Sequence, residues 1–73
     1  MPPWVRHHAI RDRRHERTFV LDLAAAVYFE LGQESGRGNF ISVDFGASAV
    51  TIYEGDDPDA YKEVAAYVEQ LGQ

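Results

Sequence analysis

The amino-acid sequence predicts a small α+β domain of the order αββα, in which a basic N-terminal arm precedes a helix, a two-stranded antiparallel hairpin and a second helix. Two patterns predict it. Apolar residues recur at helical spacing in residues 19–31 and again after residue 57. Between them, apolar and polar residues alternate on both sides of a glycine turn. The chain has 73 residues, so we interpret residues 1–73 as one domain.

The composition narrows the class of protein. The chain is 45% hydrophobic and 26% charged, as globular domains are, and it contains no cysteine for a disulfide or a thiolate metal site. A chain this short buries only about 60% of the surface that its unfolded form exposes. We therefore expect a homodimer, in which a second copy supports a thin core.

Charge is segregated along the chain. Residues 1–17 carry five arginines and all three histidines against two acids, a net charge of +3, whereas the remainder carries −8. The five arginines are Arg6, Arg11, Arg13, Arg14 and Arg17. A basic segment on an acidic body indicates either an anionic partner, such as a nucleic acid, or packing of the segment on acidic protein surface. Both interpretations stay open.

The first elements expected are the arm and a helix. Pro2 and Pro3 predict that residues 1–11 begin as an extended arm. A helix could begin near Asp12 or Thr18, since both side chains can cap it, and it would continue through residues 19–31. This helix would have a broad apolar face, with Phe19 and Phe29 on its opposite, polar side. Gly32 and residues 34–39 would end the helix and form a flexible connector.

The hairpin has the clearest pattern. Residues 40–45 and 48–54 alternate, and Gly46-Ala47 suits a two-residue turn with glycine at positive φ. Counting outward from this turn pairs Val43 with Val50, Ile41 with Ile52 and Phe40 with Tyr53. One face becomes apolar and the other polar, apart from Phe40 and Tyr53. Because two strands alone are marginal, we expect residues 4–10 or a second protomer to supply a third strand.

The second helix has local signals at both ends. Asp57 can cap it, Pro58 suits its first position and Gly72 ends it. One stripe of this helix is apolar and consists of Ala60, Tyr61, Val64, Tyr67, Val68 and Leu71.

Signals for catalysis or a metal are weak. His8, Asp12 and His15 would share a helical face if the first helix began early, but the neighbouring arginines would repel a cation. No cysteine nucleophile exists, and no serine has a histidine close in sequence. We therefore expect neither an enzyme nor a cofactor.

The leading functional interpretation is a small non-enzymatic protein-interaction or regulatory module that acts as a homodimer. Its partner-binding residues would be the aromatic side chains that the predicted elements leave on polar surfaces: Trp4, Phe19, Phe29, Phe40 and Tyr53. The alternative is a nucleic-acid-binding regulator that uses the five arginines of the arm. The apolar stretch 19–31 is shorter than the roughly 20 residues that span a bilayer, so we expect no membrane partner and a cytoplasmic location.

Overall fold

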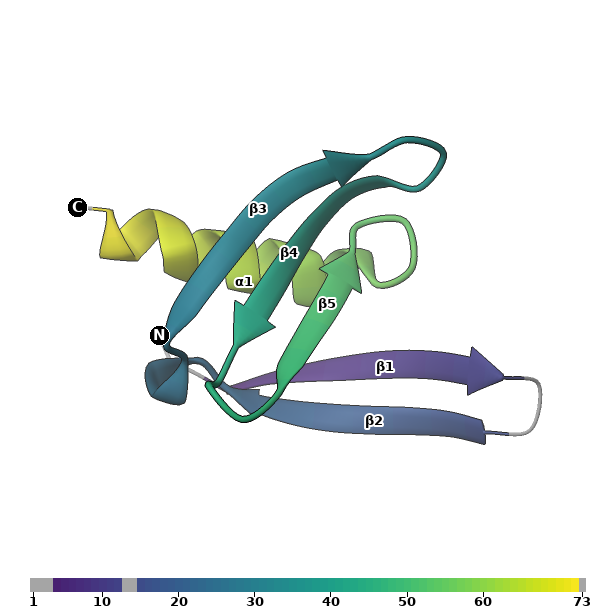
Figure 1. Ribbon diagram of the computed structural model, residues 1–73, viewed down its shortest axis with the longest axis horizontal. Helices are drawn as coiled ribbons and strands as arrows, with labels where there is room; N and C mark the ends of the chain where they lie inside the picture. The colour runs from purple at the N-terminus through teal and green to yellow at the C-terminus, as the bar shows by residue number, and fades with distance from the viewer. Residues whose placement is uncertain (1–3, 13–14, 73) are drawn as a thin grey trace.

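The computed structural model of the chain describes residues 4–12 and 15–72, with residues 7–12 and 15–18 described through their backbone alone. These residues form five strands in two sheets, one 3₁₀ turn and one C-terminal helix, a β-rich α+β fold. The elements, in chain order, are β1 (Trp4–Asp12), β2 (His15–Asp22), the 3₁₀ turn η1 (Leu23–Ala25), β3 (Tyr28–Glu34), β4 (Gly38–Asp44), β5 (Ala49–Tyr53) and α1 (Pro58–Leu71). β1 and β2 form one antiparallel hairpin, and the second sheet has the order β3-β4-β5 (Figure 1).

The helix predicted over residues 19–31 is absent, so the αββα prediction is wrong. Residues 19–22 belong to β2, residues 23–25 form η1, and β3 begins at Tyr28. The residues on both sides of Ala24–Ala26 are mostly β-branched or aromatic and favour extended backbone: Phe19, Val20, Val27, Tyr28 and Phe29. These neighbours of the three alanines therefore allow two strands as well as a helix, and pairing with β1 and β4 gives the strands.

The alanine segment instead redirects the chain from one sheet to the other. The carboxylate of Asp22 accepts a hydrogen bond of 3.1 Å from the Ala24 amide and caps η1, and Ala26 returns to extended backbone. Leu21 and Leu23 are buried, whereas Val20 is exposed and Asp22, between the two leucines, is half-buried. Buried residues two positions apart are typical of extended backbone. In a stretch this short and apolar, the same residues also fit helical spacing, so the sequence pattern did not distinguish the two.

The hairpin predicted over residues 40–54 is confirmed as β4 and β5. Phe40 pairs with Tyr53, Ile41 with Ile52 and Val43 with Val50. The turn between the strands is closed by a hydrogen bond of 2.8 Å from the Phe45 amide to the Ser48 carbonyl. Gly46 in this turn has a φ of +93°, which a side chain would disfavour.

The third strand of this sheet is β3, a segment for which the sequence pattern predicted a helix and a connector. β3 pairs antiparallel with β4, and Leu31 lies opposite Ile41. Residues 4–12 do form a strand, but β1 pairs with β2 and takes no place beside β4 or β5. The prediction that residues 4–10 or a second protomer complete the sheet is therefore wrong.

The C-terminal helix is confirmed and covers one face of the β3-β4-β5 sheet (Figure 1). Asp57 caps it by accepting a hydrogen bond of 3.1 Å from the Ala60 amide, Pro58 is its first residue and Gly72 follows its last. The buried residues come from both sheets, η1 and the helix: Val5, Leu21, Leu23, Ile41, Val43, Ile52, Ala60 and Val64. The core therefore lies between α1 and the strands.

Through its described side chains, the β1–β2 hairpin joins this core at its root. Val5 lies opposite Leu21, and both side chains are buried. Beyond this pair the hairpin extends away from the body of the protein (Figure 1). Among the described residues, the only α-helix is α1, which is neither long nor apolar enough to cross a bilayer.

Candidate functional site

The candidate site is the face of the β3-β4-β5 sheet that α1 leaves uncovered, here called the open face. In Figure 1 the three strands lie in front of the helix, so the view looks onto this face. The strand register places three rows of side chains across it. The first row is Tyr28, Asp44 and Ala49; the second is Glu30, Ser42 and Thr51; and the third is Gly32, Phe40 and Tyr53.

Two aromatic rings and a glycine form the third row. The Phe40 ring lies against Gly32, with its Cζ atom 2.8 Å from the position that a Cβ at residue 32 would take. On its other side the Phe40 ring contacts Tyr53, with ring centroids 5.8 Å apart and planes inclined by 53°. The absence of a side chain at Gly32 therefore leaves room for the Phe40 ring over β3, with the Tyr53 ring tilted against it on β5.

A guanidinium group lies at the end of this third row. The Cζ atom of Arg37 is 3.7 Å from the centroid of the Tyr53 ring, a cation–π arrangement. Its Nη2 atom is 3.2 Å from an Asp56 carboxylate oxygen, and its Nε is 3.7 Å from Glu34. Partial burial and the hydrogen bond that its hydroxyl donates to Glu34 raise the pKa of Tyr53, and Arg37 opposes this rise.

The first row has an aromatic residue and carboxylates in a similar combination. The Tyr28 side chain is 54% exposed, and its hydroxyl donates a hydrogen bond to the Asp44 carboxylate. This bond raises the pKa of Tyr28, and the negative charges of Asp44 and Glu30 add to the rise. Asp44 is held in place because it also accepts a hydrogen bond of 2.7 Å from the Gly46 amide.

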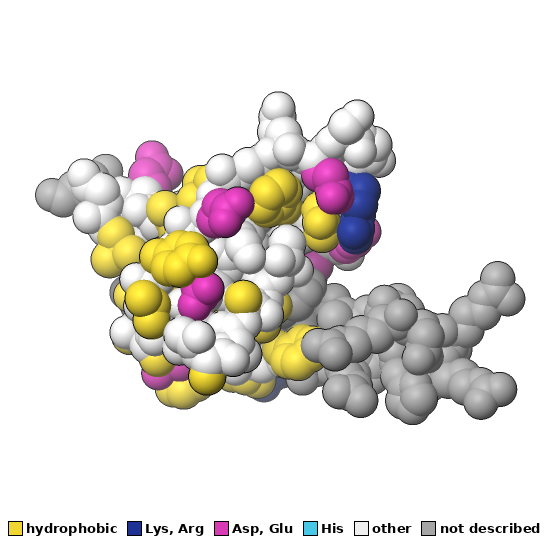
Figure 2. Space-filling model, in the orientation of Figure 1, with side chains coloured by type: hydrophobic (Ala, Val, Ile, Leu, Met, Phe, Trp, Pro, Cys, Tyr) yellow, Lys and Arg dark blue, Asp and Glu magenta, His cyan; other side chains and the backbone are white. Residues whose placement is uncertain are grey.

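The second row, between these two, holds two hydroxyl side chains and one carboxylate. The hydroxyls of Ser42 and Thr51 bond to each other at 3.0 Å, and Glu30 is exposed at the β3 end of the second row. Figure 2 shows the resulting pattern, in which hydrophobic and acidic side chains alternate over the sheet. Rows on one face of a strand are about 7 Å apart, so the first and third rows lie about 14 Å apart with the short side chains of Ser42 and Thr51 between them.

The five aromatic residues predicted as a binding surface lie in three places. Phe40 and Tyr53 lie together on the open face. Phe29 lies on the opposite side of the sheet, where its ring is 6.0 Å from that of Tyr67 on α1. Trp4 and Phe19 both line a groove of about 400 Å³ at the root of the β1–β2 hairpin.

Sequence reasoning missed Tyr28, Glu30 and Arg37, which complete the open face. The missed signal was the alternation of Tyr28, Glu30 and Gly32 with Phe29 and Leu31, which is typical of a strand. Assigning residues 19–31 to a helix concealed it. Arg37 was assigned to a flexible connector, although its residues form the β3–β4 turn, where the Arg37 amide bonds to the Glu34 carbonyl at 3.0 Å.

The arginines predicted to bind nucleic acid belong to the projecting hairpin. Arg6 and Arg11 lie on β1 and Arg17 lies on β2, while Arg13 and Arg14 are outside the described residues. His8, Asp12 and His15 lie on strands, so their helical spacing no longer places them on one face. In the described part of the chain, no group of three acidic or histidine side chains could hold a metal ion.

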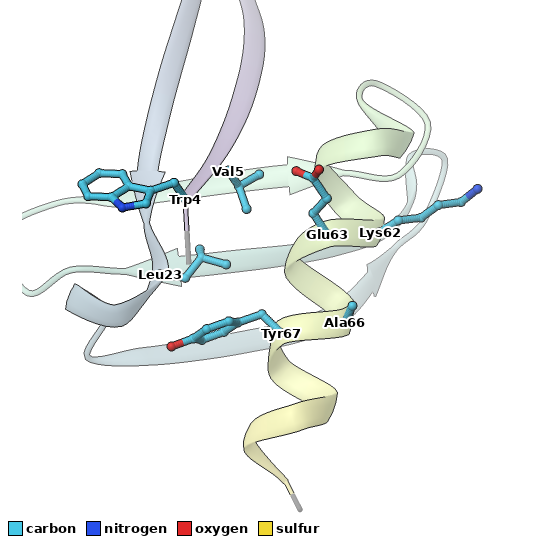
Figure 3. A pocket seen from close by; sticks show the side chains of 7 residues that line it. All are labelled: Trp4, Val5, Leu23, Lys62, Glu63, Ala66 and Tyr67. Carbon is cyan, nitrogen blue, oxygen red and sulfur yellow. The ribbon is translucent and has the colours of Figure 1, made fainter. Parts of the chain in front are cut away.

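A second concave site lies between the start of β1, η1 and α1. It has a volume of about 330 Å³ and is lined by Trp4, Val5, Leu23, Lys62, Glu63, Ala66 and Tyr67. Figure 3 shows Trp4, Val5, Leu23 and Tyr67 around it, while Lys62 extends away from the others. The lining is mainly apolar, and it contains no nucleophile paired with a base, so it favours no reaction.

Comparisons with protein-family models, with curated proteins and with solved structures found no match.

Proposed function

We propose that this protein is a non-enzymatic interaction module that binds an arginine-bearing segment of a protein partner on its open face. The proposal includes action as a homodimer in the cytoplasm. The observation that carries it is Arg37 on Tyr53: the open face already holds one guanidinium between an aromatic ring and two carboxylates.

The first row offers the same chemistry to a second cation. Tyr28 is exposed beside Asp44 and Glu30, as Tyr53 is flanked by Glu34 and Asp56. A guanidinium favours such a place, because it can stack on the ring and pair with a carboxylate in its plane. A lysine would satisfy the charge but would not stack in this way.

The shape of the face favours an extended segment. Its two aromatic rows stand about 14 Å apart, on either side of short side chains at Ser42 and Thr51. An extended chain could lie along the second row, with an arginine reaching Glu30 and Tyr28. The contacts with both aromatic rows would supply apolar burial in addition to charge pairing.

Peptide binding tests the proposal. We expect a peptide of alternating arginine and glycine, in large excess over about 10 µM protein, to shift the amide resonances of β3 and β4 in NMR spectra. The corresponding lysine peptide should bind several-fold more weakly, and a glutamate peptide should not bind.

Two variants locate the site. Tyr28→Ala and Glu30→Gln should each weaken binding of the arginine peptide, whereas Glu69→Gln, an equal loss of charge on exposed α1 surface, should not. Equal effects of Glu30→Gln and Glu69→Gln would show that only net charge matters, and the proposal would be abandoned.

The projecting β1–β2 hairpin supports a second candidate function, binding of nucleic acid. It is a two-stranded ribbon with five arginines in residues 6–17, and the major groove of duplex DNA admits such a ribbon. Changing Arg13, Arg14 and Arg17 to Ala should weaken duplex binding and lower its salt dependence by about one counterion for each arginine. Arg37→Ala is the control outside the hairpin, and no retardation of DNA or RNA at low salt would eliminate this candidate.

A further inference from the structure

We infer that the partner segment bound by the open face is the β1–β2 hairpin of a second copy of this chain, in a closed dimer in which each copy's hairpin crosses the other's sheet. The inference rests on the proposed function, and it names the partner of that same site.

Charge complementarity is the first argument. The hairpin segment, residues 4–22, has five arginines against three acids, whereas residues 23–73 have nine acids against Arg37 and Lys62. The fold turns this segregation along the chain into separation in space, because the hairpin extends away from the body. The basic hairpin of one copy and the acidic body of another, with Glu30 and Asp44 in the rows of the open face, therefore attract each other.

Surface area is the second argument. The chain has an accessible surface of 5304 Å². A compact monomer of this mass exposes about 4,500 Å². The excess of about 800 Å² equals the share of one partner in a standard protein interface of about 1,600 Å². The hairpin extends from the body as two strands without a second layer (Figure 1), and docking on a second copy would bury surface of this extent.

The third argument is the reach of the hairpin. β1 has nine residues, so it is about 30 Å long, and its core anchor at Val5 lies near its beginning. The remaining strand is long enough to cross the three strands of the open face, whose outer axes are about 10 Å apart. A two-stranded hairpin is marginal alone in water, and the second copy's sheet would stabilise it.

Two-fold symmetry makes each contact occur twice. In a closed dimer, if the hairpin of the first copy contacts the open face of the second, the hairpin of the second contacts the open face of the first. A complementary charge reversal therefore gives a sharp test. Variant F carries Glu30→Arg on the open face, and variant H carries Arg11→Glu and Arg17→Glu on the hairpin. Each variant alone opposes like charges in both contacts, whereas a mixture of the two restores opposite charges in both.

We expect sedimentation equilibrium of the full chain to give twice the monomer mass of 8.2 kDa at micromolar concentration and low salt, with weaker association at 0.5 M salt. Variants F and H should each associate at least tenfold more weakly, and their equimolar mixture should recover most of the loss. Glu69→Arg, the same charge change away from the open face, should leave association unchanged. Circular dichroism should show that every variant is folded.

The other outcomes overturn the inference in distinguishable ways. A full chain that stays at 8.2 kDa but binds the arginine peptide would leave arginine binding by the open face standing, and would remove the homodimer and with it the second copy as the partner. A dimer unaffected in F and H would place the dimer interface elsewhere, and mass that keeps rising with concentration would indicate an open chain of contacts. Duplex DNA binding that is lost in H alone, in a monomeric protein, would assign the hairpin to nucleic acid.

Discussion

The ring of Phe40 occupies the space that a side chain at Gly32 would fill, with Phe40 Cζ 2.8 Å from the Cβ position of residue 32. Gly32 lies opposite Phe40 in the β3–β4 register, so an aromatic ring on one strand covers a glycine on the next. The same ring contacts Tyr53 on the other side, which limits how far it can move away. Glycine weakens a strand, but at position 32 it provides the space that the Phe40 ring occupies on the open face.

Gly32→Ala should lower the free energy of unfolding by about 1 kcal/mol, because the new methyl group displaces the Phe40 ring. In a Phe40→Ala background the same change should be neutral or stabilising by about 0.5 kcal/mol, because alanine suits a strand better than glycine. A double-mutant cycle by urea unfolding measures the difference. An equal cost in both backgrounds would contradict the ring contact.

Burial on the two sides of β5 predicts opposite outcomes for neighbouring residues. Ile52 is fully buried under α1, whereas Thr51 is exposed on the open face. Ile52→Asp, like Val43→Asp on β4, should unfold the domain, because an unpaired buried charge costs several kcal/mol against a total stability of about 5 kcal/mol. Thr51→Asp should remain folded. Thermal melts followed by circular dichroism distinguish them, and similar melts for the two β5 variants would refute the assigned faces.

The cap of α1 predicts a graded response at Asp57. Asp57→Ala removes the acceptor of the Ala60 amide and should cost about 1 kcal/mol. Asp57→Asn keeps a suitable acceptor and should cost clearly less. Asp59→Ala, in the first turn of α1 but not the cap, serves as the control. Urea unfolding should rank the three variants with Asp57→Ala the least stable.

The titration of Tyr28 predicts a loss of stability at alkaline pH. Its pKa is raised in the folded protein above the ordinary value of 10.0, chiefly by the hydrogen bond to Asp44. The stabilisation from this bond is therefore complete below pH 10 and is lost as the pH rises through the folded pKa. Asp44→Asn removes the negative charge and should lower the pKa of Tyr28 while leaving that of Tyr53 in place. NMR of ¹³C-labelled tyrosine rings between pH 8 and 12 can measure both.

The β4–β5 hairpin and α1 could be predicted from the sequence because their signals are local. Alternation around Gly46 fixes which residues face each other, and a shift by one residue would expose Ile41 and Ile52. Asp57 and Pro58 mark the start of α1 through contacts within one turn. No partner distant in sequence is needed to recognise either element.

Residues 19–31 could not be assigned in the same way, because their 13 positions fit both a helix and two strands. Tertiary pairing decided between them: Val20 lies opposite Arg6 in the first sheet, and Phe29 lies opposite Val43 in the second. Each half of the segment gains strand hydrogen bonds from a different partner, and Ala24–Ala26 connects them. A helix would have satisfied its own backbone hydrogen bonds, but it would have left the edge of β4 that pairs with β3 without a partner strand.

The sequence by itself determined the basic N-terminal segment, the acidic body and the pairing of Phe40 with Tyr53. Only the tertiary structure added Tyr28 and Glu30 to the open face, because their side depends on the pairing of β3 with β4. It also brought Arg37 to Asp56, which is 19 residues away in sequence. The physical reason is that a strand's side chains acquire a common face only when a neighbouring strand fixes the sheet, and that neighbour is chosen by long-range contacts.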